Sequence, residues 1–456
     1  MRKWLVDTSF FLKGKSLGKA IVLPFQRFAA IEASSGIALL VAAVTGFAWA
    51  NTPFAPSYQT LFHSEIAIGI AGRAFERSVH FWINEGLMTI FFLLVGLEIK
   101  REILVGELSS FRRAVLPGMS ALGGMIVPAG LYLLLNHGTS AVSGWAIPMA
   151  TDIAFVVGAL ALAGRGLPSF LPVFLVSLAI FDDLGAVAVI AFFYVGDLQA
   201  YYLVFAGLVL VALVSFNILG FRWPLPYVIL GILLWVCTYL SGVHPTIAGV
   251  ILALSIPARS GENTGQFAEA ARLALRRFVP EGDGHYSLRL SQQNQAVVVQ
   301  LGDLLERVEP PLQRMERTLH PYVSFGVMPL FALANCGIPV DGGVMWDSVG
   351  SSSSLGILVG LFVGKQVGVF GATWLCIRCG LGKMPERMTW KHLYGGALLC
   401  GMGFTMSLFI ADLSFTNQQV HEAAKMAIVL ASLVSGTAGI LMLRMSLISR
   451  AREKTV

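Results

Sequence analysis

Two adjacent aspartates interrupt one of the most apolar stretches of the sequence. Asp182 and Asp183 lie within SLAIFDDLGAVAVIAFF, residues 177–193, which carries no other charged residue. A carboxylate at the centre of a membrane helix costs about 2.5–3.5 kcal/mol on insertion scales. We therefore expect both carboxylates to serve a function. Paired carboxylates in a low-dielectric site bind either protons or a small hard cation, because such cations prefer oxygen ligands.

Two further charged residues lie deep in other apolar segments. Asp152 follows Thr151 in GWAIPMATDIAFVVGALALAG, and Lys365 lies in GILVGLFVGKQVGVFG, too far from either end to reach water. Lys365 is expected to balance one aspartate of the pair. Neighbours on a helix point about 100° apart, so Asp182 and Asp183 can both border one cavity while only one pairs with a given partner. For Asp152 alone, a structural role at a helix break is an alternative.

These residues predict a site at which cations and protons compete. Asp182, Asp183 and Thr151, with carbonyls freed by a helix break, supply oxygen ligands for Na+, and the carboxyl pair titrates as a coupled unit. If two protons replace one Na+, each cycle moves one positive charge. A membrane potential of 100 mV then drives the exchange by about 2.3 kcal/mol. Asp152 would offset the positive ends of two crossed helices, and Lys365 the negative ends.

The composition is that of a polytopic membrane protein. Of the 456 residues, 56% are hydrophobic and 13% are charged, whereas soluble domains carry roughly 25% charged residues. Apolar segments long enough for a ~30 Å hydrocarbon core recur along the chain. We predict an all-α protein with about twelve transmembrane helices, the eighth of them short. They are placed near 30–50, 80–99, 115–136, 144–163, 170–195, 200–221, 224–241, 244–257, 321–340, 354–378, 393–412 and 422–445.

The distribution of basic residues predicts the orientation. With the amino terminus inside, 28 of the 32 Lys and Arg residues fall on cytoplasmic segments, which is the positive-inside pattern. Both termini are therefore expected in the cytoplasm. The net charge of +6 then reflects topology and contact with anionic lipid, and it does not indicate nucleic-acid binding. The amino-terminal stretch lacks the features of a signal peptide and is expected to lie as a short helix on the inner leaflet.

Two segments look like discontinuous helices. The fourth has the Thr-Asp interruption, and the eleventh, GGALLCGMGFTMSLFIADLSF, is rich in glycine with Thr405 at similar depth. Such interruptions at corresponding places in two halves are typical of inverted repeats. Each interrupted segment is the middle one of a triplet, spans 3–5 and 10–12, and the triplets start on opposite faces. We therefore predict inverted-topology repeats.

The predicted organisation is one membrane domain with an insertion. It comprises a cytoplasmic segment 1–29, spans 1–8 over 30–257, a cytoplasmic insertion 258–320, spans 9–12 over 321–445 and a tail 446–456. The insertion shows helical spacing in FAEAARLALRRFV and VVVQLGDLLERV and is interpreted as a helix pair on the inner surface. Turn formers over 51–79 favour a hairpin. Cys376 and Cys379 form a lone CxxC motif, so no cofactor is predicted.

Six stretches carry a resemblance to a known family: FFLLVGLEIKRE, ATDIAFVVGALALAG, SLAIFDDLGAVAVIAFFY, SGVHPTIAGV, LHPYVSFGVMPLFALANCGI and GFTMSLFIA. They closely resemble NhaA-type Na+/H+ antiporters over residues 30–445. TDIAF and DDLGA at this spacing are very specific. This family is itself one in which inverted repeats are known, so the repeat pattern and the resemblance are not independent.

The resemblance implies a role for each matching residue. Asp182 and Asp183 match the family's ion- and proton-binding pair, and Thr151 with Asp152 matches the interrupted fourth helix. Lys365 matches its essential lysine, expected to pair with Asp182. The family exchanges two protons for one Na+ or Li+ in the bacterial inner membrane, often as a homodimer joined by an outer β-hairpin that 51–79 would supply. The matching candidates for its response to alkaline pH are Glu98, Glu102, Glu316 and His320.

Two features depart from the family's pattern. The loop before LHP is usually much shorter than 258–320, and Gln366 stands where a proline is usual. For Glu98 and Glu102, an anchoring role at a helix end is an equal alternative to pH sensing.

Transport and not catalysis is the predicted activity, and three rival functions were weighed. A Na+-coupled symporter of an organic anion on a similar fold would need a roomier polar cavity. A channel would need rings of charges or carbonyls from several subunits. A receptor or scaffold has no use for charges at mid-membrane. The pair of acids with a buried lysine favours exchange of Na+ for protons.

Overall fold

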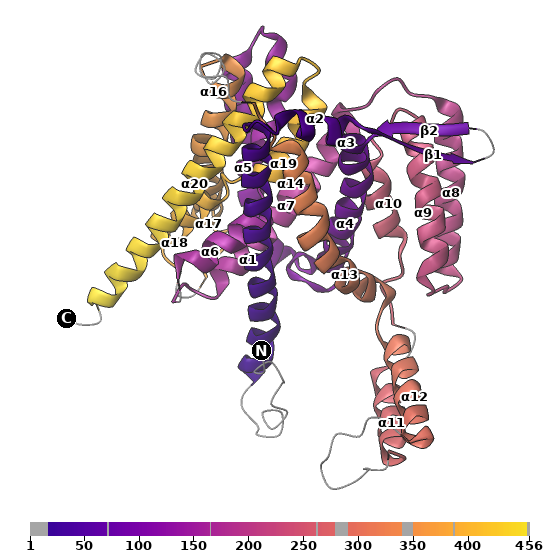
Figure 1. The fold of residues 1–456 in the computed structure, drawn as a ribbon. Helices are drawn as coiled ribbons and strands as arrows, with labels where there is room; N and C mark the ends of the chain where they lie inside the picture. Colours follow the sequence, from indigo (N-terminus) through magenta and orange to yellow (C-terminus); the bar gives the residue numbers. More distant parts are fainter. Residues whose placement is uncertain are drawn as a thin grey trace.

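The computed structural model describes residues 17–70, 73–164, 166–260, 263–278, 291–339, 350–385 and 388–453. The expected amino-terminal surface helix falls partly on residues 1–16, outside this range. The described chain is a bundle of helices with one small hairpin of strands (Figure 1). The β1–β2 hairpin marks one end of the bundle, here called the hairpin end. The first described helix begins, and the last one ends, near the opposite end, here called the terminal end.

The first half of the chain contains the following elements, in which η denotes a 3-10 or π turn. They are α1 (Leu17–Ala50), α2 (Ala55–His63), β1 (Glu65–Ile70), β2 (Arg73–Ser78), α3 (Val79–Phe81), η2 (Trp82–Leu87), α4 (Met88–Val105), η3 (Glu107–Ser109), α5 (Phe111–Asn136), η4 (Ser140–Met149), α6 (Ile153–Ala163), α7 (Phe170–Phe193), α8 (Ala200–Ile218), α9 (Pro224–Leu240) and α10 (Thr246–Ser255).

The second half adds the following elements. They are α11 (Thr264–Arg276), α12 (Gln292–Val308), α13 (Pro311–Tyr322), η5 (Val323–Val327), α14 (Met328–Asn335), α16 (Ser352–Val359), η6 (Gly360–Gly364), α17 (Lys365–Arg378), α18 (Trp390–Leu399), α19 (Phe404–Ser414) and α20 (Gln418–Glu453). The chain is thus an all-α membrane protein apart from one hairpin.

Among the described residues, five continuous helical stretches are long and apolar enough to cross a membrane, and eight if each sharply bent pair is counted as one span. The five are Phe111–Asn136, Phe170–Phe193, Ala200–Ile218, Ser352–Arg378 and Gln418–Ile448. Other apolar segments, such as α9 and α10, form shorter helices. The count of twelve therefore stays a prediction.

The stretch 51–79 contains the expected hairpin, but a helix comes before it. α2 occupies Ala55–His63, and the antiparallel pair follows, with Glu65 opposite Ser78 and Ile70 opposite Arg73. Arg77 holds the hairpin on the bundle, because its guanidinium donates to the hydroxyl of Tyr239 on α9 at 2.9 Å and lies 5.9 Å from the centre of that residue's ring.

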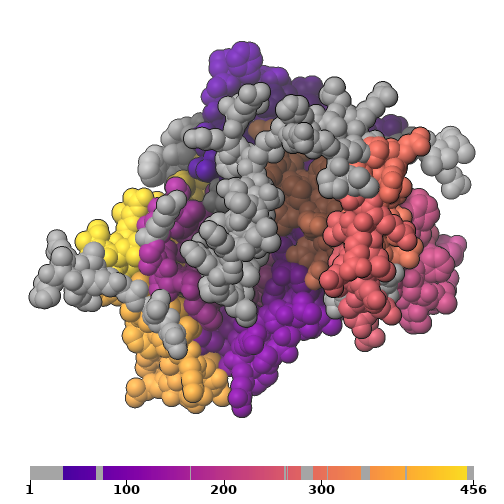
Figure 2. All heavy atoms as spheres, turned by 90° about the horizontal axis from the view of Figure 1, so that it is seen from below, coloured from indigo at the N-terminus to yellow at the C-terminus, as the bar shows by residue number. Residues whose placement is uncertain are grey.

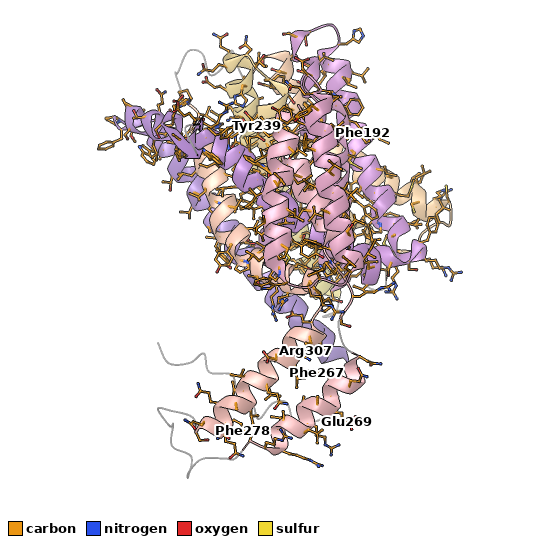
Figure 3. The ribbon with its side chains drawn as sticks, turned by 90° about the vertical axis from the view of Figure 1, so that its right-hand side faces the viewer. Phe192, Tyr239, Phe267, Glu269, Phe278 and Arg307 are labelled. Atoms are coloured by element: carbon orange, nitrogen blue, oxygen red, sulfur yellow. The ribbon has the colours of Figure 1, made fainter. Side chains whose placement is uncertain are left out.

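Residues 263–278 and 291–308 form the helices expected in the insertion, α11 and α12. They pack against each other and extend away from the terminal end (Figure 1) rather than lying along it, so the surface-lying interpretation is wrong. Seen from below, the pair lies at the edge of that face, on the side of α8 and α9 (Figure 2). Figure 3 shows Phe267 and Phe278 on this pair, far from Phe192 and Tyr239 at the other end. Leu312, buried in α13, ties the chain back to the bundle through its amide and the carbonyl of Pro257, at 3.2 Å.

Glycines bring α17 against α5 and so place Lys365. A Cβ added at Gly368 would lie 2.2 Å from the Gly123 carbonyl oxygen, and one at Gly364 would lie 2.7 Å from the Pro128 Cα. Only glycine permits such approach of two backbones, as the small-residue spacing predicts. The turn η6, directly before Lys365, is a π-helical turn, a feature often found at functional sites.

Candidate functional site

Two helix breaks meet at the centre of the bundle. η4 and α6 are bent by 48° across residues 150–152, and α18 and α19 by 42° across residues 400–403. The breaks bond to each other, because the Asp152 amide donates to the Met402 carbonyl at 2.7 Å and the Thr151 hydroxyl to the Cys400 carbonyl at 3.0 Å. Backbone groups released by one interruption are thus satisfied by the other, which a buried break requires.

Asp152 caps the helices on both sides of this crossing. Its Oδ1 accepts from the Phe155 amide at 3.2 Å, at the start of α6. Its Oδ2 accepts from the amide and the hydroxyl of Thr405, at 3.1 and 2.5 Å, at the start of α19. A carboxylate at a helix start satisfies free amides and complements the positive end of the helix dipole. The geometry is therefore that expected for a charge offsetting two helix ends.

Asp182 is held by two partners away from water. Its Oδ2 accepts from Lys365 Nζ and from the Thr151 hydroxyl, each at 2.6 Å. The side chains of Asp182 and Lys365 are both 0% exposed. Within the described part of the chain, Asp182 Oδ1 is buried without a hydrogen-bond partner. The expected ion pair of Lys365 with Asp182 is thus present, and one carboxylate oxygen is left over.

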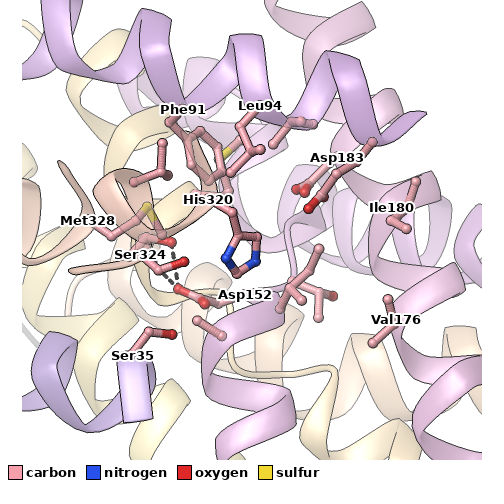
Figure 4. A pocket seen from close by; sticks show the side chains of 18 of the residues that line it. Ser35, Phe91, Leu94, Asp152, Val176, Ile180, Asp183, His320, Ser324 and Met328 are labelled. Carbon is pink, nitrogen blue, oxygen red and sulfur yellow. Dashed lines mark hydrogen bonds between the residues drawn. The ribbon is translucent and has the colours of Figure 1, made fainter. Parts of the chain in front are cut away.

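Asp183 faces a cavity that Asp182 does not reach. The cavity has a volume of about 80 Å³, enough for several water molecules. Figure 4 shows Asp152, Asp183 and His320 directed into it. Thr151 also lines the cavity, whereas Asp182 and Lys365 are not among the lining residues. The expectation that both aspartates border one cavity is therefore wrong for this conformation.

The candidates for a pH response gather where the cavity approaches the terminal end. Glu98 and His320 line the cavity, together with Arg101. Arg101 forms ion pairs with Glu102 at 3.2 Å and with Glu316 at 3.0 Å. Burial raises the pKa of Glu316, and the positive charges of Arg101 and His320 partly oppose that shift.

The sequence analysis identified Glu98, Glu102, Glu316 and His320 but missed Arg101. This arginine, on α4, forms ion pairs with Glu102 on the same helix and with Glu316 on α13. The signal available was a basic residue three positions after Glu98 on a helix, which places the two on one face. A second buried cluster, around Asp412, was also missed, although that residue lies in the quoted eleventh segment.

Comparison with known proteins places this geometry in a family. Residues 26–443 match the family described as Na+/H+ antiporter 1. The chain belongs to the NhaA-type Na+/H+ antiporters. It is 46% identical over 434 residues to the Na+/H+ antiporter NhaA of Oleidesulfovibrio alaskensis, covering 95% of this chain and 96% of that one. It is 42% identical over 435 residues to NhaA of Wolinella succinogenes, covering 95% of each chain. It is also 42% identical over 424 residues to NhaA 1 of Saccharophagus degradans, covering 93% of this chain and 91% of that one. Like other NhaA-type proteins, the chain is a multi-pass membrane protein.

Proposed function

We propose that this protein extrudes Na+, and also Li+, across the bacterial inner membrane in electrogenic exchange for protons. The observation that carries the proposal is that the two aspartates of the pair have different surroundings. Asp183 faces a cavity, and its neighbour Asp182 is tied to Lys365 and Thr151. Na+ can therefore bind Asp183 at the cavity, but it gains Asp182 as a second carboxylate ligand only by displacing the Lys365 ammonium group.

The mechanism is competition for one set of oxygens. A Na+ entering the cavity meets Asp183 and the Thr151 hydroxyl, which both line it. Asp182, whose Oδ1 is unpaired among the described residues, becomes a further oxygen ligand once its carboxylate turns toward the cavity. The bond of Lys365 to Asp182 then breaks, because Na+ and the lysine ammonium group compete for the same carboxylate. Protons leave the site on one side of the membrane as Na+ binds. Other protons bind to the site from the opposite side once Na+ has left there. We propose two protons for each Na+.

Alternating access requires that the bundle expose this site to either side in turn. We propose twelve spans with inverted repeats 3–5 and 10–12, in which the two bent pairs at residues 150–152 and 400–403 are discontinuous spans crossing at Asp152. The terminal end then faces the cytoplasm, since the segments that the predicted topology puts inside carry 28 of the 32 basic residues of the sequence. We also propose the predicted division into 1–29, 30–257, 258–320, 321–445 and 446–456.

Two further features extend the proposal. The β1–β2 hairpin at the outer side is proposed as the contact of a homodimer, as the family resemblance implies. The Arg101 cluster with Glu98, Glu102, Glu316 and His320 is proposed to adjust exchange to pH, because it stands at the cytoplasmic mouth of the cavity. The symporter of an organic anion is not favoured, because the cavity is small and lined by acids.

The test is the collapse of a respiration-generated pH gradient in everted vesicles on addition of Na+ or Li+, at pH 6.5 to 8.5. Wild type responds, and Asp182→Asn and Asp183→Asn do not. Asp197→Asn, in an exposed loop, is the matched control and responds like wild type. Electrogenicity is tested in proteoliposomes, where an imposed membrane potential changes the rate of exchange. Absence of any response to Na+ or Li+ in folded wild-type protein overturns the proposal.

A further inference from the structure

A second buried polar cluster lies at the hairpin end of the bundle, outside the site described above. Asp412, on α19, is its centre. Its carboxylate accepts from Lys425 Nζ at 3.0 Å and from Asn84 Nδ2 at 2.7 Å, and it also pairs with His421 Nε2. Asn335 accepts from Lys425 at 3.1 Å and donates to the Asn84 side-chain oxygen at 2.9 Å. His80, shortly before η2, adds its Nε2 at 3.3 Å from Asn335 Oδ1 and 3.5 Å from Asn84 Nδ2.

These side chains are shielded from water. Asn335 is 1% exposed, Asn84 6% and Lys425 7%. Groups so buried contribute strongly when satisfied and are costly when a partner is lost. The side chains of Asp412 and His421 are 11% and 21% exposed, so the network is largely but not fully shielded. It joins η2 and α14 on one side to α19 and α20 on the other.

The cluster bridges two groups of helices. α19 and α20 pack on each other and belong to the triplet of spans 10–12, whereas η2 and α14 pack on each other and lie outside both triplets. Among the described residues of this cluster, two hydrogen bonds cross between these groups, from Asn84 to Asp412 and from Lys425 to Asn335. The pairing of Asp412 with Lys425 and His421 stays within the triplet.

Between this cluster and the ion site lies a packed apolar layer. The cavity ends at Thr405 and Met406 on α19, and the three residues that follow, Ser407, Leu408 and Phe409, are fully buried. The Phe409 ring packs on Phe92 at 5.5 Å, from α4. The path from the site toward the hairpin end is therefore closed in this conformation, and the Asp412 cluster lies beyond the closure.

We infer that the Asn84–Asp412 and Lys425–Asn335 contacts form a latch that holds the extracellular side of the transporter shut while the site faces the cytoplasm. The boundary between α19 and α20 on one side and η2 and α14 on the other is here called the seam. The inference rests on the proposed function, because only alternating access requires this seam to open. Opening to the outside separates the triplet from η2 and α14, so both crossing contacts break, while Asp412 keeps Lys425 and His421 as partners. The latch thus releases without stranding a buried charge.

The experiment measures access to the seam directly. Leu408→Cys introduces a reporter thiol in the full chain, and its labelling by a membrane-impermeant maleimide is followed in right-side-out vesicles. Protein that keeps Leu408 gives the background labelling of the native cysteines. Asn84→Ala and Asn335→Ala each remove a crossing contact and are expected to label at least tenfold faster, a shift of about 1.4 kcal/mol toward the open state. The control is Ser120→Ala, which removes a buried bond of 2.6 Å to Thr373, between α5 and α17 within the triplets.

A second pair of variants guards against misfolding. Asn84→Asp places a carboxylate against Asp412 and should also accelerate labelling. Adding Asp412→Asn exchanges donor and acceptor, re-forms the bond and should return the rate to within about threefold of wild type. Labelling at the wild-type rate in all Asn variants, or equal acceleration by Ser120→Ala, overturns the latch. Because labelling needs no Na+ exchange, a wild type that labels as expected but lacks exchange overturns the proposed function alone.

Discussion

Loss of both partners of the buried pair of Lys365 and Asp182 should destabilise the protein no more than loss of either one, and much less than the sum of the two single losses. The Nζ and Oδ2 atoms are 2.6 Å apart, and both side chains are 0% exposed. Breaking a buried pair by removing one member costs about 3–5 kcal/mol, because the other charge is left without compensation. Replacing both members by neutral groups removes that penalty.

The two single changes should differ. In Lys365→Met, Asp182 keeps the Thr151 hydroxyl as a donor at 2.6 Å, and a hydrogen bond to a charged group contributes about 1.5–3 kcal/mol. We therefore expect a loss near 3 kcal/mol. In Asp182→Asn the lysine retains its charge but loses its carboxylate, and we expect a loss near 5 kcal/mol. The two single losses sum to about 8 kcal/mol, so a double variant that loses about 3 kcal/mol or less gives a coupling energy of at least about 5 kcal/mol.

The free energy of unfolding is measured by denaturant titration of the detergent-solubilised protein, followed by circular dichroism. Arg317→Met is the control, because Arg317 pairs with Glu309 at 2.8 Å but is 70% exposed, and a surface pair contributes at most about 1 kcal/mol. Single losses below about 1 kcal/mol that add in the double variant would refute the reasoning.

Three further variants test the close packing of α17 on α5, the helix capping by Asp152 and the cluster of charged residues around Arg101. Gly368→Ala forces a Cβ against the Gly123 carbonyl and should cost about 1–3 kcal/mol of unfolding free energy. Asp152→Ala removes the cap of two helices and should cost about 1 kcal/mol for each helix start in the same titration. Glu316→Gln should flatten the decline of thermal stability with rising pH. A carboxyl whose pKa is raised in the folded state above its ordinary 4.5 binds more protons than in the unfolded chain. Its contribution is therefore full below pH 4.5 and is lost as pH rises through the folded value.

Each of these variants has a matched control. Gly371→Ala adds a methyl group on the same helix where nothing lies within 4 Å, so it should be neutral or stabilising, and an equal loss there would contradict the packing argument. Asp152→Asn should retain most of the stability, since asparagine also caps helices. A loss equal to that of Asp152→Ala would contradict the capping role. Glu309→Gln should leave the pH slope unchanged, and identical slopes in all three proteins would exclude Glu316 as its source.

Much of the site could be predicted from residue type and depth. Asp152, Asp182, Asp183 and Lys365 are rare charges in apolar segments, and burying a charge is so costly that the sequence alone marks them. The helix interruptions were also predictable, because Thr-Asp and clustered glycines weaken a helix wherever they stand. The two helix pairs are bent at residues 150–152 and 400–403, beside Thr151 and within the glycine-rich stretch; that each bent pair is one discontinuous span stays a prediction.

Only the tertiary structure decided which aspartate faces the cavity. Asp182 and Asp183 have the same chemistry, and a rotation of α7 by about 100° would exchange their roles. The bonds of Asp182 to Lys365 on α17 and to Thr151 at the crossing fix that rotation, and they join residues as far apart in the sequence as Asp182 and Lys365. The Asp412 cluster was hidden for the same reason. Its members come from several elements, and no local pattern records that they meet, because helix packing is determined by side chains distant in the sequence.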